Sequence, residues 1–108
     1  MNAIRKLYSA FELAAPGSNT SFAAFTPFYT TSFVRIAIRP VTGTVVNLIV
    51  TSGATSVVCG LNASTVVAAG DLKTFDPVPV HSEFSYALQV ETDGVISYVS
   101  IVELEGCL

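Results

Sequence analysis

The chain contains few of the side chains that carry out catalysis. His81 is the one histidine, and it follows a proline pair and precedes Ser82-Glu83. A catalytic triad needs a nucleophile on a strained turn beside a buried acid, and no Gly-x-Ser-x-Gly motif is present to supply one. The glycine patterns that bind phosphates and dinucleotides are also absent. We interpret His81 as a surface or turn residue and expect no enzymatic activity and no cofactor.

Carboxylates are the second group with chemical potential. Glu103 and Glu105 alternate along one stretch, and Asp71 and Asp76 are close in sequence. Such oxygen ligands can bind calcium at a subunit contact, but acidic side chains in contact with solvent are the simpler interpretation. A carboxylate pair can also hydrolyse glycosides, although a chain of 108 residues without tryptophan offers little for a sugar cleft. We therefore predict no metal site.

The two cysteines are far apart in sequence. Cys59 lies among valines, which predicts a buried small hydrophobic residue, and Cys107 is the penultimate residue. Free thiols are favoured over a disulfide between them.

The elements that must position these residues are short β-strands. Apolar and polar residues alternate along most of the chain after about residue 30, which is typical of strands with one buried face. Turn residues separate these runs at short spacing, which favours a sandwich or a small barrel. We predict one all-β domain over 1–108, an antiparallel β-sandwich or jelly-roll-like barrel of about seven or eight strands. The expected strands are 32–39, 44–51, 55–60, 65–68, 72–76, 84–91 and 95–104.

Two local signals predict specific geometry. Asp93-Gly94 separates two alternating runs and indicates a tight hairpin, because both residues tolerate positive φ. Pro77 and Pro79 remove backbone donors at alternate positions, so that segment should lie at a sheet edge or cross between sheets.

Residues 1–30 are expected to form an N-terminal strand or arm followed by an aromatic connector. Helix is the alternative for the first 15 residues, because they include good helix formers. Residues 20–30 are predicted to plug one end of the domain, or else to form an aromatic contact patch. Four aromatic residues gather there: Phe22, Phe25, Phe28 and Tyr29.

Composition points to association. The chain is 51% hydrophobic with a mean hydropathy of +0.61, which is high for a small domain and predicts exposed apolar area. Four of its five cations lie in the first 39 residues, whereas seven of its eight acidic residues come after them. No basic stripe with interleaved aromatics suits nucleic acid, and no run of about 20 apolar residues suits a membrane span.

Arg35 and Arg39 share one face of an expected strand with Phe33 and Ala37 between and beside them. One interpretation is a solvated outer face. The other is pairing with carboxylates across a subunit boundary, for which arginine is well suited.

The chain from Thr31 to Glu105 resembles small virion proteins of tailed bacteriophages, which are short all-β chains with little charge. The residues that carry the resemblance are 33–38 (FVRIAI), 44–48 (TVVNL), 61–64 (LNAS) and 84–94 (FSYALQVETDG). Capsid decoration (cement) proteins fit best in size. The resemblance implies a homotrimer on the capsid surface of the virion, made in the bacterial cytoplasm and clamping neighbouring major capsid proteins.

The function expected from the sequence is therefore stabilisation of an assembled phage capsid. The alternative is a tail or fibre module that recognises a host glycan, with Tyr29, Tyr86 and Tyr98 as a stacking platform. We predict these capsid or subunit contacts: Ile4, Arg5, Lys6, Leu7, Tyr8, Phe25, Phe28, Tyr29, Arg35 and Arg39.

Overall fold

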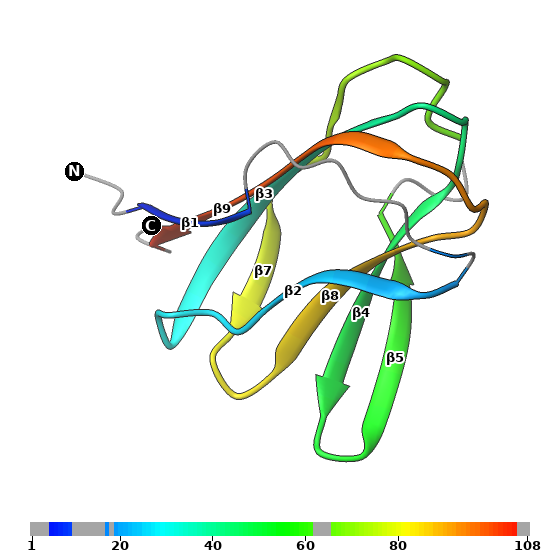
Figure 1. Cartoon of the computed structure of the whole chain (residues 1–108). Helices are drawn as coiled ribbons and strands as arrows, with labels where there is room; N and C mark the ends of the chain where they lie inside the picture. The colour runs from blue at the N-terminus through cyan, green and yellow to red at the C-terminus, as the bar shows by residue number, and fades with distance from the viewer. Residues whose placement is uncertain (1–4, 10–16, 18, 62–65, 106–108) are drawn as a thin grey trace.

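The computed structural model describes residues 5–9, 17, 19–61 and 66–105, which form nine strands and no helix. The strands belong to two antiparallel sheets that face each other, so the predicted all-β sandwich is confirmed (Figure 1). Their bounds are β1 Arg5–Ser9, β2 Ser21–Phe25, β3 Thr31–Pro40, β4 Val46–Ser52, β5 Thr55–Gly60, β6 Lys73–Thr74, β7 Val78–His81, β8 Ser85–Val90 and β9 Ile96–Glu105. Within these ranges no helix could span a membrane.

One sheet, here called sheet A, has the order β1-β9-β3-β6, and β7 pairs with the other end of β3. Its centre is the long pairing of β3 with β9, which runs from Ser32 opposite Glu105 to Pro40 opposite Ile96. Sheet B has the order β2-β8-β4-β5. Both sheets therefore pair strands that are distant in sequence.

The core lies between the two sheets and results from the alternation. In β3 every second residue from Ser32 to Pro40 is buried, whereas the residues between them are exposed or half-buried. Burying one face of each pleated strand removes the apolar side chains from water. The largest fully buried apolar side chains are Ile36, Ile38, Leu48, Leu88, Ile96 and Ile101.

The prediction of a hairpin at Asp93-Gly94 is wrong. β8 pairs with β2 and β4 in sheet B, whereas β9 pairs with β1 and β3 in sheet A. The segment between them crosses from one sheet to the other. Gly94 has a φ of 155°, and a Cβ there would lie 2.9 Å from Thr42 Oγ1. Glycine is therefore required by a close approach to Thr42 and not by a hairpin turn.

The proline segment lies at a sheet edge, as predicted. β7 pairs with β3 alone among the described strands, with Pro79 opposite Phe33, and so forms an edge of sheet A. Proline has no N–H to donate to a neighbouring strand, so it is tolerated at the edge of a sheet.

The described part of the first 30 residues contains two strands. β1 pairs with β9, so residues 5–9 form a strand and not a helix. Part of the expected aromatic connector is β2, which was not anticipated and pairs with β8 through a bulge at Ala23, whose φ is 54°. The strand expected at 65–68 is reduced, within the described residues, to an isolated bridge between Val67 and Thr44.

Candidate interaction surface

The outer face of sheet A combines apolar side chains with two arginines. We call it the arginine face. Register and alternation bring its residues together from the two central strands: Phe33, Arg35, Ala37 and Arg39 of β3, and Tyr98, Ser100, Val102 and Leu104 of β9. Six of these residues are half-buried and both arginines are exposed. A flat apolar surface with guanidinium groups on it can bind a partner that offers carboxylates.

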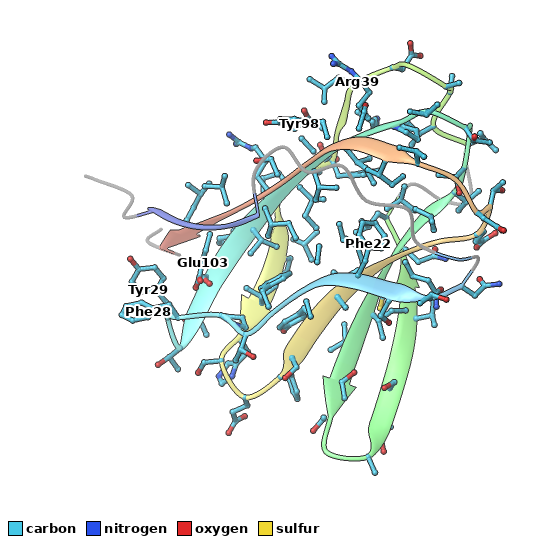
Figure 2. All side chains as sticks on the ribbon, viewed as in Figure 1. Phe22, Phe28, Tyr29, Arg39, Tyr98 and Glu103 are labelled. Atoms are coloured by element: carbon cyan, nitrogen blue, oxygen red, sulfur yellow. The ribbon has the colours of Figure 1, made fainter. Side chains whose placement is uncertain are left out.

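Within the part of the chain that the structure describes, neither arginine has an acidic partner. Arg35 lies opposite Val102 and Arg39 opposite Tyr98 in the register, and no carboxylate of the described residues forms an ion pair with either. Figure 2 shows Arg39 and Tyr98 next to each other at one end of this face. Both arginines are exposed, so a carboxylate of a partner can approach them.

The N-terminal contact residues can be placed only by register. Arg5 stands opposite Leu104 and Leu7 opposite Val102, so β1 extends the sheet beside the arginine face. Ile4 lies outside the described residues, as do Cys107 and residues 62–65.

A second exposed feature is the loop between β2 and β3. Phe28 is 68% exposed and meets Tyr29 edge to face, with ring centroids 5.1 Å apart. Figure 2 shows both rings at the end of the sandwich, beside Glu103. Of the four aromatic residues expected there, Phe28 is exposed and Tyr29 is half-buried beside it.

Glu103 holds that loop from within and is not a solvated acid, which corrects the sequence interpretation. Its side chain is fully buried, and Oε1 accepts a hydrogen bond of 2.9 Å from the backbone N–H of Phe28. Oε2 accepts bonds of 3.0 Å from the N–H of Tyr29 and 2.6 Å from Ser32 Oγ. The available signal was parity, because Glu103 alternates in step with the buried Val99 and Ile101.

Two predicted aromatic contacts belong to the core. Phe25 is 6% exposed and stacks on Tyr86, with centroids 5.4 Å apart, so Phe25 is withdrawn from the contact set. Tyr86 is 5% exposed, and its hydroxyl accepts a 2.9 Å hydrogen bond from the N–H of His81. The platform of Tyr29, Tyr86 and Tyr98 therefore does not form.

The imidazole of His81 contacts Glu83. His81 Nδ1 accepts a 3.1 Å hydrogen bond from the N–H of Glu83 and lies 3.8 Å from its carboxylate, which places the imidazole in the turn after β7. Among the described residues no three His, Cys, Asp or Glu side chains gather as metal ligands would.

A groove of about 430 Å³ opens between the edges of the two sheets. It is lined mostly by apolar residues of β4, β5, β7 and β8, with Asp76 as its acid. Cys59 lines it and is an exposed free thiol, so the expected burial of this residue is wrong. The reason is that β5 is an edge strand whose six residues are all exposed.

Comparison with protein-family models, with curated proteins and with solved structures finds no match for this chain.

Proposed function

We propose that the chain is a structural virion protein that binds the assembled capsid of a tailed bacteriophage and stabilises it. The observation that carries the proposal is the arginine face, with exposed Arg35 and Arg39 on a half-buried apolar sheet and no acid of the described residues to neutralise them. Arginine and aromatic residues are enriched at protein interfaces, where the guanidinium fork pairs with carboxylates. The rigid sandwich fixes their spacing.

The mechanism is linkage. A protein that binds the assembled shell and not its separated subunits stabilises the shell in proportion to the logarithm of its free concentration over its dissociation constant. The arginine face meets this requirement if the carboxylates that it contacts come together only when neighbouring shell subunits assemble. No bond is made or broken in the process, which agrees with the structural role of His81 and Glu103.

The test uses particles produced with and without the protein. We expect particles that lack it to release their DNA at a lower temperature, measured by the entry of a DNA-binding dye, while adsorption to cells is unchanged. Particles of equal thermal stability, with or without the protein, would overturn the proposal.

A tail module that binds a host glycan is the second candidate, and the observation that favours it is the exposed ring of Phe28 beside the half-buried ring of Tyr29. Aromatic rings can stack on the apolar faces of sugars. In that case Phe28→Ala should reduce adsorption to host cells and leave the thermal stability of the particle unchanged. The two candidates therefore differ in which measurement responds.

A further inference from the structure

Among the described residues, the β5 edge of sheet B lacks the protective features that the other sheet edges have. Exposed edge strands pair with other chains unless charge, proline, bulges or short length prevents it. β1 contains Arg5 and Lys6 and an irregular register, and β2 has the bulge at Ala23. β6 has two residues and β7 contains Pro79. β5 is a regular strand of six residues with no proline and no charge.

The backbone groups that β5 presents outward can be identified. Leu61 N–H donates to the carbonyl of Val46, so this opposed pair is hydrogen-bonded. Hydrogen-bonded and non-hydrogen-bonded pairs alternate along an antiparallel ladder. The pairs Cys59–Leu48 and Val57–Val50 are then hydrogen-bonded, and the residues between them direct N–H and C=O away from β4. These outward-facing residues are Ser56, Val58 and Gly60.

The turn that joins β4 to β5 gives the same assignment of outward and inward residues. Ser52 and Thr55 are opposed across a loop of two residues, and Gly53 at its first position has a φ of 61°. Such two-residue turns close on a hydrogen-bonded pair. Counting from that pair again places Ser56, Val58 and Gly60 outward.

We propose that β5 pairs antiparallel with β5 of a second copy of this chain, about a two-fold axis at Val58. Residues whose N–H and C=O groups point outward must oppose each other across the interface. Outward and inward residues alternate along β5, so the two-fold axis must pass through a residue position and not between two residues. The axis at Val58 opposes Val58 to itself and Ser56 to Gly60, and it uses all three outward residues of each copy. This register forms about six backbone hydrogen bonds between the two copies. A register with the axis one residue away would form fewer.

The side chains favour a second copy over a foreign strand. At the axis the side chain of Val58 faces its own counterpart, so a charge there would meet a like charge. β5 carries none, and its centre is apolar, with Val57 55% and Val58 57% exposed. Pairing would cover both valines and join the two four-stranded B sheets into one continuous sheet. This symmetry predicts a dimer and replaces the trimer that the resemblance implied.

The register can be tested by disulfide cross-linking between two copies of the full chain. Both copies carry Cys107→Ser. An axis at Val58 opposes Val57 of one copy to Cys59 of the other in a close, non-hydrogen-bonded pair, within disulfide range. Val57→Cys with native Cys59 should therefore give a covalent dimer on mild oxidation. The matched control, Val57→Cys with Cys59→Ser, should stay uncross-linked. Cross-linking of the control instead would place the axis at residue 57 and overturn the register.

The interface itself is tested by charge at the axis, with sedimentation velocity as the measurement. Val58→Lys and Val58→Glu should each be monomeric at a concentration where the wild type is dimeric, because each opposes like charges. An equimolar mixture of the two should recover the dimer. Val58 is exposed, so circular dichroism should show both variants folded. A wild-type monomer throughout the concentration range, or an oligomer that survives both substitutions, would overturn the proposal.

Discussion

Ser32 Oγ donates a hydrogen bond of 2.6 Å to Glu103 Oε2 inside the sandwich, where Glu103 is completely buried and Ser32 is 3% exposed. The same carboxylate accepts the N–H groups of Phe28 and Tyr29. A buried carboxylate is costly unless it is well hydrogen-bonded, and the two N–H donors come from the loop that carries the exposed Phe28 ring. The core therefore fixes the conformation of a surface feature.

Glu103→Gln should destabilise the fold, because an amide has one acceptor oxygen and its NH2 group would face backbone donors. We expect a loss of about 2 kcal/mol in the free energy of unfolding, measured by chemical denaturation. Glu83→Gln is the matched control, since the Glu83 side chain is 77% exposed and should be insensitive. Equal stability of the two variants would show that the Glu103 carboxylate is not needed.

Gly94→Ala should destabilise the protein by about 1 kcal/mol or more, because the added Cβ collides with Thr42. The double variant with Thr42→Gly should recover part of the loss, which a double-mutant cycle measures as a coupling energy. Gly53→Ala has a strained φ but no atom within 4 Å, so it should lose stability without coupling to Thr42. Additivity at Gly94 and Thr42 would contradict the close approach.

The strands β3, β4, β5, β8 and β9 were predictable because each is a local pattern, whereas β2 and the pairing of the strands were not. Asp93-Gly94 has the composition of a hairpin turn, yet the strands beside it enter different sheets. Sheet choice depends on contacts across the whole domain, to which the turn residues contribute little. The edge position of Pro79 was predictable because a proline excludes the alternative locally.

Burial at the candidate surface was predictable only where alternation is regular. Arg35 and Arg39 lie outward as their parity indicates. Phe25 is buried because β2 pairs with β8 through a bulge, and a bulge reverses the parity of the residues after it. Cys59 is exposed although it is apolar, because sheet B ends at its strand. Neither the bulge nor the edge has a clear sequence signal in this chain.

The bulge can be tested at Ala23, whose φ of 54° disfavours β-branched side chains. Ala23→Val should lower the melting temperature, whereas Ala24→Val, at the next and exposed position of the same strand, should leave it unchanged or raise it slightly. Identical effects at the two positions would indicate a regular strand.

Tyr86→Phe should remove the acceptor of the His81 N–H and cost about 1 kcal/mol of stability, measured by thermal or chemical denaturation. The control is Tyr98→Phe, which removes a hydroxyl group from the half-buried arginine face rather than from the core. If Tyr98→Phe were the more damaging change, the assignment of Tyr86 to the core network would be wrong.

The most direct test of the account is an equilibrium binding measurement on assembled shells from which the protein has been removed. We predict that wild-type protein binds these shells and not the dissociated subunits, and that Arg35→Glu with Arg39→Glu weakens binding about tenfold or more. Lys73→Glu, which reverses a cation opposite Ile38 and off the arginine face, should bind like the wild type. Equal affinity of the double variant and the wild type would contradict the arginine face as the capsid-binding surface.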